Sequence, residues 1–140
     1  MREHMGLYRG KRIDNGEWVE GWLVIKKDPI LEVTYCFILA YGKGESFVTW
    51  YPVDPDTVGE CTGLRDKNGK LIFEGDIVTA TDGILGSPFV DGITGKIVYD
   101  ETAFFIEPKD IMETEYLFNE CAVYEIIGNI HDNPELLKGG

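Results

Sequence analysis

Positive charge is scarce in this sequence. Its 140 residues contain 13 Lys and Arg against 25 Asp and Glu, which gives a formal net charge of −12 at pH 7. A protein that binds nucleic acid through a broad basic surface needs cations to neutralise the phosphates. The composition therefore argues against a general nucleic-acid-binding surface.

Long apolar runs and clustered cysteines are also missing. No stretch approaches the roughly 18 apolar residues of a membrane span, and no signal peptide precedes the first motif, so we expect a cytoplasmic protein that does not bind membranes. Cys36, Cys61 and Cys121 are widely spaced and odd in number, which favours reduced core thiols. With only His4 and His131 to add, no zinc-binding spacing exists, and we predict neither a metal nor a cofactor.

The negative charge is concentrated in the second part of the chain. Residues 1–50 carry seven basic and seven acidic side chains, whereas residues 71–137 carry fourteen carboxylates and only Lys96 and Lys109. The change falls near the stretch 53–59, which is rich in Pro and Asp. We predict an N-terminal β region over residues 1–52, an acidic C-terminal region over 53–137 and a short tail over 138–140, with one continuous domain as the alternative.

Runs of β-branched and aromatic residues, separated by Gly, Asn and Asp, predict a mainly β fold with little helix. Residues 7–13 and 18–25 flank Asn15-Gly16, a pair typical of a tight hairpin turn with two positive φ angles. The continuous apolar run 35–41 predicts a strand covered on both faces. Another strand is expected over 47–51, ended by Pro52 because proline cannot donate to a ladder.

The sequence pattern of the C-terminal region predicts a small, strongly bent, barrel-like sheet built from several short strands. Gly63, Gly69 and Gly75 recur every six residues, and we expect the chain to reverse at each because glycine adopts positive φ without strain. Asn68 belongs to the second of these turns, and Asp76 is expected to cap the third by accepting backbone N–H bonds.

Four segments of the chain resemble the YopX family of proteins from phages and prophages of Gram-positive bacteria: residues 57–59, 62–70, 73–78 and 125–136. The resemblance implies a mainly β fold and a phage or prophage setting. It implies no established activity and no catalytic residues.

The long loop over residues 82–95 is rich in apolar side chains, which need a cover. Packing on the rest of the domain, self-association and binding of a foreign partner are the three alternatives. The residues concerned are Ile84, Leu85, Phe89, Val90 and Ile93.

Taken together, these patterns favour a phage or prophage accessory protein that acts as a non-enzymatic protein-interaction module. Its acidic surface would meet a basic protein partner, and a homo-oligomer is a second expectation. The first alternative is a metal-dependent phosphodiester hydrolase that uses clustered carboxylates, namely Asp76, Asp91, Asp100 and Glu101.

The second alternative is weak nucleic-acid binding through the basic N-terminal segment. The side chains concerned are Arg2, Arg9, Lys11, Arg12, Lys26 and Lys27. We assign Trp18, Trp22 and Trp50 to the core rather than to a stacking platform, because the acidic chain offers no basic track beside them.

Overall fold

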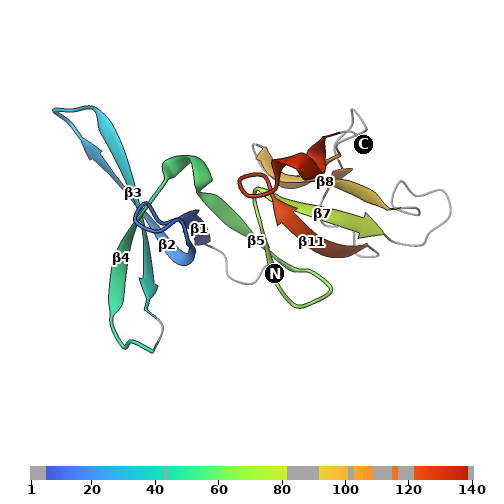
Figure 1. Cartoon of the computed structure of the whole chain (residues 1–140), viewed down its shortest axis with the longest axis horizontal. Helices are drawn as coiled ribbons and strands as arrows, with labels where there is room; N and C mark the ends of the chain where they lie inside the picture. The colour runs from blue at the N-terminus through green and yellow to red at the C-terminus, as the bar shows by residue number, and fades with distance from the viewer. Residues whose placement is uncertain are drawn as a thin grey trace. The chain divides into compact units, whose positions relative to one another are not determined.

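The structure of the protein, a computed structural model, describes residues 6–42, 44–81, 92–100, 103–108, 115–116 and 122–138. The chain divides into two compact units, the first ending at Cys61 and the second beginning at Thr62. Val53, where the sequence predicts the junction, is the last residue of a strand in the first unit. Both units are built from antiparallel strands (Figure 1), so the predicted mainly β fold is confirmed.

In the first unit, the strands pair in the order β4-β3-β2-β1-β5. Their bounds are β1 Leu7–Lys11, β2 Trp18–Asp28, β3 Val33–Tyr41, β4 Val48–Val53 and β5 Gly59–Arg65, which continues into the second unit. A 3-10 turn, η1 (Pro55–Thr57), connects β4 to β5 and is capped by the Asp54 carboxylate, which accepts a hydrogen bond from Asp56 N at 3.0 Å.

The predicted hairpin of β1 and β2 is confirmed, but its turn is longer than the two residues expected. Arg12 N donates to Glu17 O at 2.8 Å, and Gly16 N donates to Arg12 O at 2.9 Å. Gly16 has a φ of 73°, whereas Asn15 is not among the residues with positive φ. Asn15 instead accepts a hydrogen bond from Glu17 N at 2.9 Å, an Asx turn that holds the loop.

Two expectations about β3 and β4 are wrong. The run 35–41 is not covered on both faces: Cys36, Ile38 and Ala40 are buried, while Tyr35 and Tyr41 are exposed. Pro52 does not end its strand. On the side of β4 away from β3 the described residues form only an isolated bridge, between Arg12 and Val53, and there the Pro52 carbonyl accepts from Ile13 N at 2.9 Å, so the missing N–H interrupts no ladder.

The core of the first unit lies on one face of its sheet. Cys36, Ile38 and Val53 are its buried centre, and half-buried side chains from β1, β2 and the end of η1 pack against them. Side chains alternate between the two faces of a strand, so the residues between these core positions point to the opposite side. The opposite face is left without cover from the described residues of this unit.

The second unit contains a sheet of order β10-β9-β8-β7-β11 together with the end of β5 and strand β6. The bounds are β6 Leu71–Phe73, β7 Asp76–Thr81, β8 Ile93–Asp100, β9 Ala103–Pro108, β10 Glu115–Tyr116 and β11 Val123–Asn129, followed by the 3-10 turn η2 (Pro134–Leu137). In the part of the chain that the structure describes, β10 and β11 do not pair, so the sheet is not a closed barrel and the term barrel-like applies only loosely.

The predicted turn residues of this unit take different roles. Gly69 and Gly75 have φ angles of 83° and 93° where the chain reverses. Gly63 also has a positive φ, 84°, but it lies inside β5, where the chain does not reverse. Asp76 is 2% exposed, and its carboxylate accepts a hydrogen bond from Phe73 N at 2.8 Å, which closes the β6–β7 turn.

The turn between β5 and β6 is organised by Asp66. One carboxylate oxygen accepts from Asn68 N and Lys70 N, both at 2.9 Å, and the other accepts from Ile126 N of β11 at 3.2 Å. Lys67 N also donates to the carbonyl of Tyr124 at 2.8 Å. Asp66 thus ties a local turn to a strand 60 residues later in the sequence.

We expect Asp66→Ala to lower the free energy of unfolding by about 2 kcal/mol, because an amide that loses its partner in a partly buried place costs about 1–3 kcal/mol. Urea titration followed by circular dichroism measures the loss. Glu135→Ala, at an exposed position of η2 in the same unit, is the matched control and should change stability by no more than about 0.5 kcal/mol. Equal effects of the two substitutions would contradict the structural role of Asp66.

Candidate functional site

The face of the first sheet opposite its core carries exposed aromatic side chains. Trp22 is 58% exposed, Tyr41 59%, Trp50 46% and Tyr35 45%. Strand alternation and the pairing register place further residues on the same side, Trp18, Val24, Phe37, Leu39 and Val48 among them. We call this set of nine residues the aromatic face.

The register arranges the aromatic face in rows across three strands. Trp22 of β2 lies opposite Leu39 of β3, which in turn lies opposite Trp50 of β4. In the next row Phe37 lies opposite Val24, and its ring meets that of Trp50 edge-on with centroids 5.7 Å apart. Edge-to-face contacts of this kind fix ring orientation, so the face presents preformed aromatic surfaces to solvent.

Cations lie over two of these rings. The Lys26 ammonium is 4.8 Å from the centroid of the Trp50 ring, and the Arg9 guanidinium is 4.6 Å from that of Trp18. Lys11 also approaches Trp18, at 5.6 Å. Such contacts hold long basic side chains flat on the sheet.

Predicting Trp22 and Trp50 as core residues was therefore wrong, and Trp18 is only half-buried. The sequence does contain a usable signal, because aromatic residues at 35, 37 and 41 alternate with the small or aliphatic residues Cys36, Ile38 and Ala40. A period of two in an apolar run indicates two different faces even when both are apolar.

The predicted association loop falls mostly outside the described residues, including Ile84, Leu85, Phe89 and Val90. Ile93, its last member, lies at the start of β8 and is 9% exposed. Its side chain packs in the core of the second unit with Ile97 and Phe104. Of the three alternatives, this residue follows the first, packing on its own domain.

Of the four carboxylates proposed for metal binding, only Asp76 has a described side chain. Asp76 is buried in a turn, and the side chains of Asp91, Asp100 and Glu101 lie outside the described residues. Among the described residues, no three His, Cys, Asp or Glu side chains gather closely enough to hold a metal ion. Burial raises the pKa of the Cys36 thiol, which disfavours the reactive thiolate.

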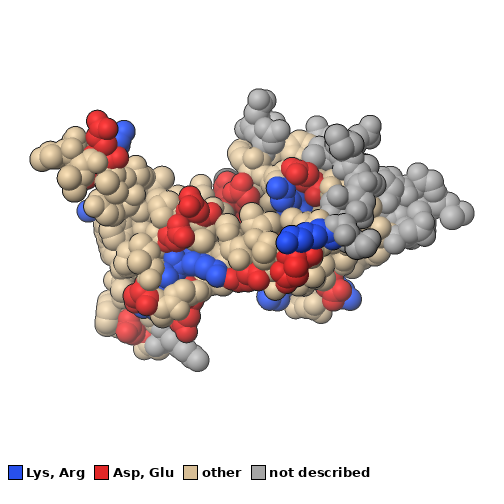
Figure 2. All heavy atoms as spheres, turned by 45° about the horizontal axis from the view of Figure 1, so that its top comes forward, with Lys and Arg blue, Asp and Glu red and all other residues tan. Residues whose placement is uncertain are grey.

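Acidic and basic side chains are interspersed on the face of the molecule that Figure 2 shows. Lys96 pairs with Glu107 at 3.6 Å in the second unit, and Asp66 and Asp76 are buried. Eight of the fourteen carboxylates between residues 71 and 137 lie outside the side chains that the structure describes. Most of the predicted acidic surface therefore falls on residues outside the described ones.

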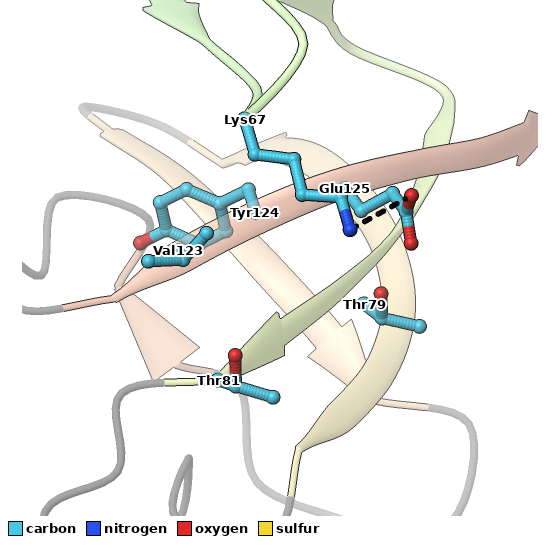
Figure 3. Close-up of a pocket in the computed structure, with 6 residues that line it drawn as sticks. All are labelled: Lys67, Thr79, Thr81, Val123, Tyr124 and Glu125. Atoms are coloured by element: carbon cyan, nitrogen blue, oxygen red, sulfur yellow. Dashed lines mark ion pairs between the residues drawn. The ribbon is translucent and has the colours of Figure 1, made fainter.

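The described surface has a hollow beside β7 and β11 and another near the β2–β3 turn. The first, of about 210 Å³, lies beside β7 and β11 and is shown in Figure 3, with the ammonium of Lys67 paired to Glu125 at 3.2 Å above Thr79 and Thr81. It is smaller than the roughly 300–1,000 Å³ of most small-molecule sites. The second, of about 610 Å³, is lined by exposed residues near the β2–β3 turn, Lys27, Pro29 and Glu32.

By its fold, the protein is an antiparallel β protein of two units, one of which exposes the aromatic face of its sheet. The chain belongs to the YopX family: the model of this family, described as YopX protein, matches residues 7–138. The predicted resemblance to that family is confirmed. No helix among the described residues has the length and apolarity needed to cross a membrane.

Two solved structures are similar to the chain over nearly its whole length. Protein EF1440 from Enterococcus faecalis is 27% identical, with a TM-score of 0.50, over 94% of this chain and 96% of that one. Protein yopX from Bacillus subtilis is 18% identical, with a TM-score of 0.54, over 99% and 100% of the two chains, and supports the fold alone. A comparison with curated proteins finds no match.

The hydrogen bonds of Asp66 predict how stability depends on pH. Burial by itself would raise the pKa of Asp66, but amide donors from Lys70, Ile126 and Asn68 hold the pKa of this carboxyl below its usual range. A depressed pKa in the folded state stabilises the protein above the pKa of the unfolded chain, and this stabilisation is lost as the pH falls through the folded pKa.

We therefore expect the free energy of unfolding to fall below about pH 5, and to fall less steeply in Asp66→Ala than in the unchanged chain. Asp14 and Asp28 also have lowered pKa values and contribute equally to both proteins, so the difference between the two curves isolates Asp66. Urea titrations between about pH 3 and pH 7 measure it. Parallel curves would show that Asp66 has the same pKa in both states.

Proposed function

We propose that this protein is a non-enzymatic protein-binding module whose contact surface is the aromatic face of the N-terminal sheet. The observation that carries the proposal is the exposure of Trp22, Tyr35, Tyr41 and Trp50 on one side of a single sheet. A soluble domain that leaves several large aromatic side chains in water loses the free energy of burying them, unless a partner covers them.

The composition of the aromatic face fits a protein partner. Tryptophan and tyrosine are the residue types most enriched at the energetic centres of protein interfaces, where they fill pockets on the partner. Here they are accompanied by aliphatic side chains, Val24, Leu39 and Val48, which offer no stacking surface for a base. Mixed aromatic and aliphatic patches of this kind favour contact with another folded surface.

The charges near the aromatic face do not favour nucleic acid. Arg9, Lys11 and Lys26 lie on this side of the sheet, and so do the carboxylates of Glu20 and Asp28 by their register. A near balance of charge releases few counterions from a phosphate backbone. The strongly acidic composition of the whole chain adds to this argument.

The described carboxylates also support a binding role over metal-dependent hydrolysis. Asp66 and Asp76 use their oxygens to accept backbone N–H bonds in two turns, which stabilises the fold and leaves fewer lone pairs for an ion. A phage or prophage setting and action in the host cytoplasm belong to the same proposal, through the family. A basic partner for the acidic C-terminal region stays a prediction.

The double substitution Trp22→Ser and Tyr41→Ser tests the proposal. Both residues are more than half exposed, so we expect stability to change by no more than about 1 kcal/mol while protein binding is lost. The tagged chain is expressed in a Gram-positive bacterium together with a second copy that bears a different tag. The tagged chain is then purified, and the proteins that stay bound to it are identified by mass spectrometry.

Tyr99→Ser is the matched control, because Tyr99 is 44% exposed on β8 in the other unit. A protein retained by the unchanged chain and by the control, but not by the double variant, supports the aromatic face as the contact surface. Identical retention by all three, with folding verified by circular dichroism, would contradict it.

A further inference from the structure

The pattern of residues along the aromatic face points to one occupant. Resting on the proposed function, we propose that the face binds a second copy of this chain, in a twofold dimer in which the two sheets stack face to face. Three features carry the proposal: the order of charges along β2, the register across β2, β3 and β4, and the size of the exposed patch.

The outward residues of β2 read Glu20, Trp22, Val24 and Lys26 in order. Consider a twofold axis that lies between the two sheets, perpendicular to the strands, and passes over β2 midway between Trp22 and Val24. This axis reverses the direction of β2 in the second copy, so each outward residue faces the residue at the same distance on the other side of the axis. Glu20 then faces Lys26 of the second copy, and Lys26 faces its Glu20. The charge pattern of a single strand is thus complementary to itself in reverse.

The neighbouring strands are complementary under the same axis. The register places Leu39 opposite Trp22 and Phe37 opposite Val24, so the axis passes between Leu39 and Phe37 on β3. Tyr41 then meets Tyr35 of the second copy, and Leu39 meets its Phe37. Large rings therefore face rings or aliphatic side chains, and no carboxylate is forced against another on β2 or β3.

The exposed area of the aromatic face is large enough for an interface between two copies. An aromatic side chain can bury about 150–250 Å², and four of them at roughly half exposure offer roughly 400 Å² per copy. Their half-buried neighbours on the aromatic face extend this patch toward the roughly 800 Å² per partner of a standard interface. A patch at the small end of specific interfaces predicts a dimer whose formation depends on protein concentration.

Sedimentation of the 140-residue chain over a range of protein concentrations is the first test. We expect a mass of about twice 15.8 kDa at high concentration and a monomer after dilution. Glu20→Lys and Lys26→Glu should each raise the dissociation constant about tenfold or more, because each places like charges opposite one another twice in a twofold interface. The combined swap, Glu20→Lys with Lys26→Glu, should restore it to within about threefold.

Two controls match the change in net charge. Lys27→Glu alters the adjacent residue of β2, which points away from the aromatic face, and Glu17→Lys alters the loop before β2. Both should leave the dissociation constant within about twofold. Single reversals that behave like these controls, or a swap that fails to restore binding, would overturn the proposed stacking.

The outcomes separate this inference from the proposed function. A folded chain that is monomeric throughout, but whose retention of another protein still depends on Trp22 and Tyr41, would overturn the second copy as occupant and keep the protein-binding face. A monomer that binds a fluorescent oligothymidylate, with affinity lost in the Trp22→Ser and Tyr41→Ser variant, would make single-stranded nucleic acid the occupant and overturn both.

Discussion

One constraint governs the N-terminal unit: a single antiparallel sheet has two faces, and its core covers only one of them. Every second residue of β3 packs inward around Cys36 and Ile38, so the residues between them must face outward. In most half-covered sheets those outward residues are polar. Here they are aromatic and aliphatic, which is the physical origin of the aromatic face and of the binding role that we propose for it.

In the C-terminal unit, two buried carboxylates hold turns in place. Asp66 and Asp76 are buried, yet each carboxylate accepts backbone amide hydrogen bonds that offset its loss of hydration. Asp66 joins the β5–β6 turn to β11, and Gly75 donates to Ile97 O while its own carbonyl accepts from Ile130 N. Short strands of this unit are therefore held by turns that bond to distant strands.

Membership of the YopX family and the likeness to two solved structures agree with this architecture. They support the fold, and the role of the protein has to be inferred from its surfaces. The aromatic face is the feature that indicates a partner, because it exposes large aromatic side chains, whereas charges of both signs are mixed on the face that Figure 2 shows. The function of this chain is therefore best sought in the molecule that covers the aromatic face of the N-terminal sheet.

The sequence by itself determined the mainly β fold, the hairpin around Gly16, the turn at Gly69 and the capping role of Asp76, because these depend on neighbours a few residues apart. Tertiary structure alone decided that Trp22 and Trp50 are exposed, that Pro52 is tolerated in an edge strand, and that Asp66 bonds to Ile126. Those facts depend on which strands pair and which face is covered. Pairing between distant segments is not encoded in local composition, so an apolar strand shows its period in the sequence but not which of its two faces meets water.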